Sequence, residues 1–289
     1  MKIPEFVHDP IIYPRARAAI LTMLTRPRFY GPAAAIRQYE FRDGQPQQVQ
    51  LLRQENGLSI WQTAAGELAT MATELPGHLS NLLSEFERNQ YLHPPLQLSP
   101  GAIVLDVGAN IGLFTLQALK AGARQVMSFE PNPATRKALE YNVASVAAKG
   151  VVTVVGKGAW HTAGAFTMTV DPFRPGRSSV VVPSPDPASY QVEVQLGKLD
   201  EMARELPRVD FIKMDIEGAE VNALKGAAGI ITRWKPQLSI AVEHTSDRLA
   251  NAEQVRRTVL EIRPDYRCVP GPYTIMPDRK IVPDILYFQ

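Results

Sequence analysis

The sequence contains a single cysteine, Cys268, among its 289 residues. One cysteine excludes a disulfide within the chain and a zinc cluster built from several thiolates, and it fits a reducing compartment. A strong charge of either sign is also missing, since 31 basic and 29 acidic residues leave a net charge of +2. This balance gives no electrostatic reason to expect nucleic acid or an anionic membrane as a partner.

Long apolar runs are absent as well. No stretch reaches the roughly 18 apolar residues that are typical of a membrane-spanning helix, so we expect no integral membrane segment. Scattered prolines and arginines follow the opening MKIPE, where a secretory signal would have an apolar core. These features predict a cytoplasmic protein, and the 45% of hydrophobic residues is ample for a sizeable core.

The first part of the chain, residues 1–97, predicts a smaller α+β extension. Its expected elements are a short helix over 15–25, a hairpin of strands 47–53 and 58–63 around Asn56-Gly57, and a helix over 77–91. A linker over 96–101 leads out of it. We expect this extension to shape a binding site or to form an oligomer interface, and a homodimer stays open.

The second part, residues 98–289, alternates short apolar strands with helices. Strands are expected over 103–107, 124–129, 151–155, 209–214 and 238–242, and helices over 111–122, 134–148, 218–229 and 250–262. Continuous apolar strands separated by helices predict a doubly wound, mostly parallel α/β sheet covered on both faces. Segments 266–269 and 285–288 predict a terminal antiparallel pair.

An insertion near 161–197 interrupts this alternation. Short strands are expected over 165–170, 179–182 and 191–195, and five prolines lie between Asp171 and Tyr190. A surface hairpin with a stiff loop and a lid over an acceptor pocket account for the pattern equally well.

A glycine-rich turn, Asp106-Val-Gly108-Ala-Asn110-Ile-Gly112, joins the first strand of this sheet to its first helix. Glycine lets the backbone turn tightly and approach a ligand at the carboxyl edge of the sheet. Glu130 ends the second strand, and a carboxylate there can accept hydrogen bonds from both hydroxyls of a ribose. Asn110 replaces the second glycine of a dinucleotide fingerprint, and no phosphate-binding Gly-Lys-Ser/Thr follows. A nucleoside without phosphate, as in S-adenosyl-L-methionine, therefore fits better than a dinucleotide.

Two longer segments carry a family resemblance. VLDVGANIGLFTLQALKAGARQVMSFEPNP and FIKMDIEGAEVNALKGA, together with Leu199-Asp200 and the closing PDILYF, resemble the FkbM family of methyltransferases over about residues 100–289. The resemblance implies a class I methyltransferase fold, which is Rossmann-like. It also implies transfer of a methyl group from S-adenosyl-L-methionine, usually to a hydroxyl of a sugar or natural product, with S-adenosyl-L-homocysteine as the product.

The same resemblance implies a set of cofactor-binding positions. The glycine turn would line the methionine portion, Asp106 would support that turn or the amino group, Glu130 would hold the ribose, and Gly158-Ala159 would contact the adenine edge. The full set is Asp106, Gly108, Ala109, Asn110, Gly112, Glu130, Pro131, Gly158, Ala159 and Asp215.

Candidates for the catalytic base follow the fourth and fifth strands. Asp215 comes after the fourth strand, and Glu243 and His244 come after the fifth, so all three stand at the carboxyl edge of the sheet. Asp215, Glu217 and Glu243 could also offer oxygen ligands to magnesium. The spacing is not diagnostic and His244 offers a metal-free base, so magnesium stays open.

Two neighbours of these acids receive structural expectations. We expect Lys213 to point to the opposite side of its strand from Asp215 and to pair, partly exposed, with an acid. Glu220 is expected to be a solvated or salt-bridged helix residue.

The sequence therefore predicts an O-methyltransferase that acts on a small-molecule acceptor. An N-methyltransferase would share the donor site, but the Asn/Asp-Pro-Pro-Tyr type motif of many amino-directed enzymes is absent after the fourth strand. A non-catalytic protein that binds the cofactor or serves as a scaffold is the alternative from another class.

Overall fold

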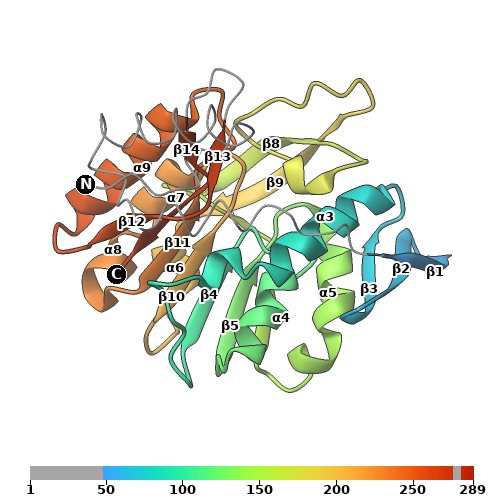
Figure 1. Ribbon diagram of the computed structural model, residues 1–289, viewed down its shortest axis with the longest axis horizontal. Helices are drawn as coiled ribbons and strands as arrows, with labels where there is room; N and C mark the ends of the chain where they lie inside the picture. The colour runs from blue at the N-terminus through green and yellow to red at the C-terminus, as the bar shows by residue number, and fades with distance from the viewer. Residues whose placement is uncertain (1–47, 276–280) are drawn as a thin grey trace, which may run out of the picture.

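The computed structural model describes residues 48–275 and 281–289, which include a seven-stranded sheet of order β12-β15-β11-β10-β4-β5-β6 (Figure 1). The predicted helix over 15–25 and residue 47 of the first predicted strand lie outside the described residues. The sheet strands are β4 (Ile103–Val107), β5 (Gln125–Phe129), β6 (Val152–Val155), β10 (Phe211–Met214), β11 (Gln237–Ala241), β12 (Cys268–Pro270) and β15 (Ile285–Phe288).

The pairing directions confirm the predicted fold class. Strands β6, β5, β4, β10 and β11 are parallel to one another, and β15 is antiparallel to both of its neighbours, β11 and β12. A parallel sheet places the carboxyl ends of its strands along one edge. The glycine turn after β4, Glu130 after β5 and Asp215 after β10 therefore share that edge.

Helices cover both faces of the sheet, because alternate strand residues point to opposite sides. Ile103 and Leu105 of β4 enter one apolar core, while Val104 enters another. The first core is closed by α6 (Leu199–Met202), α7 (Glu220–Lys225), α8 (Ala228–Trp234) and α9 (Arg248–Ile262). The second is closed by α4 (Leu113–Lys120) and α5 (Pro133–Ala147).

The single helix expected over 218–229 is two helices, α7 and α8. A Cβ atom at Gly226 would lie 2.0 Å from the carbonyl oxygen of Trp160, so the chain passes another backbone closely at the break. Asp200 then accepts hydrogen bonds from the backbone N–H groups of Gly229 and Ile230 at the start of α8. A side chain 30 residues away along the chain therefore satisfies the second helix's free donors.

The N-terminal extension forms a three-stranded antiparallel sheet and a helix. Its elements are β1 (Gln50–Glu55), β2 (Leu58–Thr63), β3 (Gly66–Met71), α3 (Pro76–Glu87) and the 3-10 turn η2 (Gln90–Leu92). The predicted hairpin is confirmed, and β3 was missed. The predicted helix over 77–91 was too long, because Asn89 takes a left-handed conformation with φ 53° that ends it.

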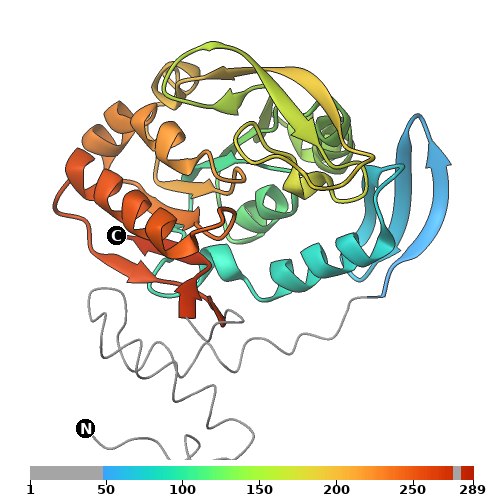
Figure 2. The same cartoon turned by 90° about the horizontal axis from the view of Figure 1, so that it is seen from above.

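The extension packs directly against the part of the chain that contains the seven-stranded sheet. Figure 2 shows β1–β3 at one end of the molecule and α3 leading back from them toward the large sheet. The side chain of Asn142 on α5 donates to the carbonyls of Ala69 and Ile111 and accepts from the N–H of Ala69. In the expected linker, Leu96 and Leu98 are buried in the second core.

The insertion contains β8 (Gly164–Val170), the 3-10 turn η3 (Pro175–Arg177) and β9 (Tyr190–Gly197), and β9 pairs with β7 (Gly158–Ala159), which comes just before the insertion. Two of its three predicted strands are confirmed. The strand expected over 179–182 is wrong, since only one isolated bridge, Thr169 to Ser179, forms there. The Ser179 hydroxyl accepts from the N–H groups of Val181 and Val182, which turns the chain and removes both donors from strand pairing.

A small antiparallel pair, β13 (Tyr273–Ile275) and β14 (Ile281–Pro283), precedes β15. Within the two described ranges, no helix combines the length and apolar character needed to cross a bilayer.

Candidate active site

The glycine turn after β4 is held in a strained, close-packed conformation. Gly108 has φ 79° and Asn110 has φ 49°. A Cβ atom at Gly108 would stand 1.9 Å from the carbonyl oxygen of Asp215, so only glycine fits there. The N–H groups of Gly108 and Ala109 both donate to the carbonyl of Phe129, which ties the turn to the end of β5.

A buried ion pair supports this turn from below. Lys213 is 4% exposed and Asp106 is fully buried. The Nζ atom of Lys213 donates to the carbonyl of Gly108 at 2.6 Å and lies 3.4 Å from the Asp106 carboxylate. Thr115 donates to the second Asp106 oxygen at 2.7 Å. Asp106 therefore lies beneath the turn and pairs with the lysine that binds the Gly108 carbonyl.

The expectations for Lys213 were wrong in two respects. The residue is buried rather than partly exposed, and it lines the same pocket as Asp215. The reason is the strand periodicity, since residues two apart point to the same face. Lys213 does pair with an acid, as expected, and that acid is Asp106.

One pocket opens beside the glycine turn, and we call it the Glu130 pocket. It is lined by Gly108, Asn110, Glu130, Pro131, Gly158, Ala159, Met168, Pro175, Gly176, Ser178, Val180, Leu196, Asp215, Ile216, Glu217 and Ala219. Seven of the ten predicted cofactor-binding positions are thus brought together. Of the other three, Asp106 lies beneath the turn, Ala109 lines a second pocket, and Gly112 packs where a Cβ atom would meet Leu139 of α5 at 2.7 Å.

Glu130 is one of three acidic residues that line this pocket, with Asp215 and Glu217. Its two carboxylate oxygens accept from the N–H groups of Asn110 at 3.0 Å and Asn132 at 2.9 Å. Burial nevertheless raises the pKa of Glu130 to about 7, because these hydrogen bonds and the charge of Lys213 only partly offset desolvation. The Asn110 side-chain oxygen is also buried and lacks a partner within the described part of the chain. Both groups suit a ligand that brings hydrogen-bond donors.

The insertion covers the Glu130 pocket through η3 and the segment after it. A Cβ atom at Gly176 would lie 3.2 Å from the Asn110 side chain. Ser179 donates to the carbonyl of Glu217 at 2.7 Å, and Thr73 of the extension donates to the carbonyl of Pro172 at 2.6 Å. The insertion is therefore tied down on two sides, and its residues line the Glu130 pocket.

A second pocket opens on the other side of the turn, and we call it the Glu85 pocket. Its lining residues are Leu82, Glu85, Phe86, Tyr91, Gly108, Ala109, Asn110, Ile111, Leu113, Phe114, Gln117, Lys213 and Asp215. Gly108, Asn110 and Asp215 line both pockets. The two pockets therefore meet at the glycine turn, and the extension supplies much of the second one.

Asp215 stands at this meeting point within a polar cluster. Tyr91 donates to its Oδ2 at 2.7 Å, and its Oδ1 lies 2.8 Å from Nε2 of His244. Nδ1 of His244 lies 3.0 Å from a carboxylate oxygen of Glu217, whose left-handed φ of 55° helps to place it there. The imidazole thus sits between two carboxylates.

The charges of the cluster follow from this geometry. Burial alone would raise the pKa of Asp215, but His244, Lys213 and the hydrogen bond from Tyr91 hold it well below its usual range. Burial alone would lower the pKa of His244, but Asp215 and Glu217 raise it well above its usual value. At neutral pH the cluster therefore holds an imidazolium between carboxylates.

Glu243, the third predicted catalytic residue, faces elsewhere. Its carboxylate lies 3.4 Å from the guanidinium of Arg248, and it lines neither the Glu130 pocket nor the Glu85 pocket. Among the predicted magnesium ligands, Asp215 and Glu217 are close together, but the side chain grouped with them is His244. The oxygen-rich set that magnesium prefers is therefore not the set assembled here.

The expectation for Glu220 was wrong. It is fully buried, and one carboxylate oxygen accepts from the N–H groups of Ile216 and Gly218. Glu220 therefore holds the shape of the 215–219 loop.

Sequence reasoning missed Glu85 and Tyr91, which both belong to the extension. Glu85 gave little signal, because it lies beside the apolar stripe of α3 formed by Leu79, Leu82, Leu83 and Phe86 rather than within it, where an acid is ordinary. Tyr91 gave none, since its partner Asp215 is 124 residues away.

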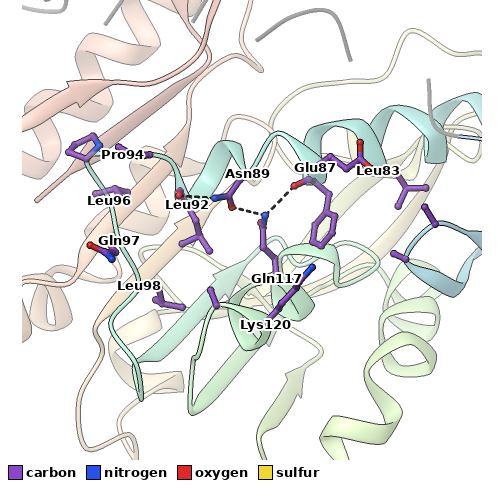
Figure 3. Close-up of a pocket in the computed structure, with 15 residues that line it drawn as sticks. Leu83, Glu87, Asn89, Leu92, Pro94, Leu96, Gln97, Leu98, Gln117 and Lys120 are labelled. Carbon is purple, nitrogen blue, oxygen red and sulfur yellow. Dashed lines mark hydrogen bonds between the residues drawn. The ribbon is translucent and has the colours of Figure 1, made fainter. Parts of the chain in front are cut away.

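A larger groove lies away from the glycine turn, between α3, η2, the segment 94–98 and α4 (Figure 3). It holds about 1070 Å³. Gln117 reaches across one wall to Asn89, with the two side chains 2.6 Å apart. Phe86 and Gln117 line both this groove and the Glu85 pocket, but no residue of the glycine turn lines the groove.

Comparison with known proteins gives a consistent picture. The family model described as the methyltransferase FkbM domain matches residues 106–266, which is more than half of the chain. The methyltransferase sdnD of Sordaria araneosa is 30% identical over 176 residues, covering 50% of this chain and 67% of that protein.

Two further relatives differ in the acceptors that their names indicate. The 31-O-demethyl-FK506 methyltransferase FkbM of Streptomyces tacrolimicus is 37% identical over 95 residues, covering 32% of this chain and 33% of that protein. The arginine N(omega)-methyltransferase of Streptomyces achromogenes subsp. streptozoticus is 35% identical over 78 residues, covering 26% and 22%. The chain thus spans about two thirds of the first relative and a third or less of these two.

A crystal structure of methyltransferase FkbM from Methylobacillus flagellatus shares the fold, with a TM-score of 0.54. It is 20% identical, and the superposition covers 96% of this chain and 60% of that one.

Proposed function

The chain belongs to the methyltransferase FkbM domain family and is a methyltransferase; we propose that its donor is S-adenosyl-L-methionine and its acceptor a hydroxyl group of a small molecule. One observation carries the proposal: a nucleoside-type pocket and a second, acid-bearing pocket meet at Gly108, Asn110 and Asp215. Methyl transfer needs this arrangement, since donor and acceptor must meet in line.

The residues of the Glu130 pocket fit the donor chemically. Glu130 would accept hydrogen bonds from the ribose hydroxyls, and the unpartnered oxygen of Asn110 would accept one from the amino acid end. When bound, the donor supplies a methyl group already activated on a sulfonium. The chain's part is then to hold the turn rigid, exclude water and align the acceptor.

The segment 175–182, which covers the Glu130 pocket, would have to move for the donor to bind. The pocket holds about 70 Å³, whereas pockets for small-molecule ligands usually hold about 300–1,000 Å³. The segment 175–182 would shift outward to admit the donor and close again through Ser179. Such closure would keep water from the reacting centre.

The extension would form the acceptor side. Leu82, Glu85, Phe86 and Tyr91 line the Glu85 pocket, opposite the glycine turn. We therefore assign residues 48–97 to acceptor positioning. A hydroxyl acceptor is favoured by the missing amino-directed motif after β10 and by the name of the FK506-related relative.

N-methylation is a second candidate. Two carboxylates, Glu85 and Asp215, line the Glu85 pocket and would suit a cationic amine. One relative is named as an arginine methyltransferase. We propose a reaction without magnesium in either case, because the imidazolium of His244 already lies between Asp215 and Glu217, where a cation would bind.

The test is calorimetric titration of the purified chain with S-adenosyl-L-homocysteine, with NAD as the control. Binding of the former alone is expected, and it would justify a screen of hydroxyl and amine acceptors with labelled donor, in magnesium and in chelator. A preference for NAD, or no binding of either, would contradict the proposal.

A further inference from the structure

Glu85 is a charged residue for which neither the fold nor the donor site provides a role. Its side chain is half-buried on the inner face of α3 and lines the Glu85 pocket with Tyr91, Asn110 and Asp215. Across residues 48–275 and 281–289, no hydrogen bond or ion pair engages it. Removing a carboxylate from water without a partner is costly, so a purely structural position would favour an apolar residue.

The other groups that might take a proton from the acceptor are already engaged. Both nitrogens of His244 face carboxylates at 2.8 and 3.0 Å, so the imidazole has no free lone pair. Asp215 accepts from Tyr91 and faces His244, and its pKa is held well below the usual range, which makes it a weak base. Glu243 lines neither pocket. Glu85 is the carboxylate that remains.

The surroundings of Glu85 set its basicity. Burial raises its pKa to about 7, and Asp215 after β10 and Glu243 after β11 act in the same direction. Arg88 and His78 on α3 act in the opposite direction. Tyr91 and Lys213 also face this pocket, the former as a donor to Asp215 and the latter as a donor to the glycine turn. A base is most effective when its pKa lies near the working pH.

We propose that Glu85 is the general base that removes the proton of the methyl acceptor. The proposal rests on the proposed function. Glu85 takes the proton while a lone pair of the acceptor oxygen forms the bond to the methyl carbon. The carbon–sulfur bond breaks, its electron pair stays on sulfur, and a neutral thioether leaves. Glu85 then releases the proton to solvent.

The position of Glu85 also fits the direction of transfer. The Glu130 and Glu85 pockets share Gly108, Asn110 and Asp215, so a donor held in the first presents its methyl group toward the second. Glu85 comes from a different element than these three residues, and it lines only the second pocket. A base there approaches the acceptor without displacing the donor.

The experiment measures binding of two probes to the full chain, so it needs no knowledge of the acceptor. The probes are S-adenosyl-L-homocysteine and sinefungin, an analogue with a protonated amine where the donor carries its methyl group. Calorimetry from pH 6 to pH 8.5 gives the affinity ratio of the two. We expect the preference of the wild type for sinefungin to rise at least about fivefold over this range, as Glu85 ionises beside the amine.

Glu85→Gln is expected to remove this rise while leaving the affinity for S-adenosyl-L-homocysteine within about twofold. Glu87→Gln removes an exposed charge from the same helix and should keep the rise. Glu243→Gln tests a carboxylate outside both pockets whose pKa burial likewise raises to about 7, and it should also keep the rise.

The proposal is overturned if Glu85→Gln keeps the pH-dependent preference, or if Glu243→Gln alone removes it. Failure of the wild type to bind S-adenosyl-L-homocysteine at any pH is a different result, which overturns the proposed function itself. In turnover with a hydroxyl acceptor, Glu85→Gln should lower kcat at least about 100-fold with little change in KM, and the fall in rate below pH 7 should disappear.

Discussion

The two pockets on either side of the glycine turn are built in different ways. The Glu130 pocket is lined by the segments that follow β4, β5 and β6, by the insertion, and by residues 215–219, which follow β10. The Glu85 pocket draws on α3, η2, the glycine turn and β10, which are far apart in the sequence. The side that we propose for the donor thus depends on the sheet edge and the insertion, whereas the side that we propose for the acceptor depends on how the extension docks. Variation of the extension could change the acceptor without disturbing the donor.

The largest expected effect comes from a residue that both pockets share. Gly108→Ala would force a Cβ atom to within 1.9 Å of the Asp215 carbonyl, so the turn or the 215–219 loop must shift. We expect the affinity for S-adenosyl-L-homocysteine to fall about 100-fold or more, since left-handed strain and overpacking each cost about 1–3 kcal/mol. Calorimetry would measure it.

Gly150→Ala is the matched control for that substitution. Gly150 has φ 72°, but a Cβ atom there would meet no other atom within 4 Å, so only the backbone strain is shared. Equal losses in the two variants would contradict the role given to the Gly108–Asp215 contact.

The second-largest effect is expected at Glu130, and it distinguishes the Glu130 pocket from the Glu85 pocket. Glu130→Gln should weaken binding of S-adenosyl-L-homocysteine by about 1–3 kcal/mol, because a charged acceptor for the ribose hydroxyls is lost. The pH-dependent preference for sinefungin should remain, since Glu85 is untouched. Glu140→Gln on α5, where the side chain is 56% exposed, serves as the control. An unchanged affinity in folded Glu130→Gln protein would contradict the proposal that Glu130 binds the ribose hydroxyls.

His244→Gln tests the acceptor side and should change stability more than donor affinity. Burial opposes the charge on His244, but Asp215 and Glu217 outweigh it and raise the pKa. A raised pKa stabilises the fold fully below the unfolded value of about 6.5, and this stabilisation is lost as the pH rises through the folded value. The variant should therefore lose about 1–3 kcal/mol of unfolding free energy at pH 6 and less at pH 9.

Urea unfolding at the two pH values measures this difference, and His161→Gln at an exposed position is the control. A destabilisation that is independent of pH would show that the imidazolium between Asp215 and Glu217 contributes nothing. Affinity for S-adenosyl-L-homocysteine should change by less than about threefold, given that His244 does not line the Glu130 pocket.

The smallest effect is expected at the cover of the Glu130 pocket. Ser179→Ala removes the hydrogen bond to the Glu217 carbonyl, which is worth about 0.5–1.5 kcal/mol. The dissociation rate of S-adenosyl-L-homocysteine should rise about two- to tenfold, as measured by stopped flow. Ser99→Ala, at an exposed position in the 96–101 segment, should leave it unchanged. A dissociation rate that Ser179→Ala does not alter would mean that this bond does not hold the cover closed.

Seven of the ten predicted cofactor-binding positions line one pocket, because the signals that predicted them are local. The glycine turn and Glu130 lie near each other in the chain, and strand order brings their ends to one edge. The acceptor side could not be predicted in the same way. Tyr91 meets Asp215 across 124 positions, and Glu85 reaches the turn only because α3 packs against α4.

The errors within the fold have the same physical origin. Gly226 ends α7 because a distant backbone passes close by, and Ser179 diverts two N–H groups from a strand that its valines would favour. Lys213 was misplaced for a simpler reason, because its two-residue offset from Asp215 puts both on one face.

The hydrogen bonds between the Asn142 side chain and the backbone of Ala69 have a consequence for the order in which the chain folds. Residue 69 is synthesised 73 positions before its partner, and the apolar cluster around β2 and β3 includes Ala138 of α5 besides Leu79 and Leu83 of α3. Closing so long a loop carries an entropic cost that only the later contacts repay. In the nascent chain the extension therefore completes its packing only after α5 has been made, and the wall of the Glu85 pocket that α3 provides is completed with it.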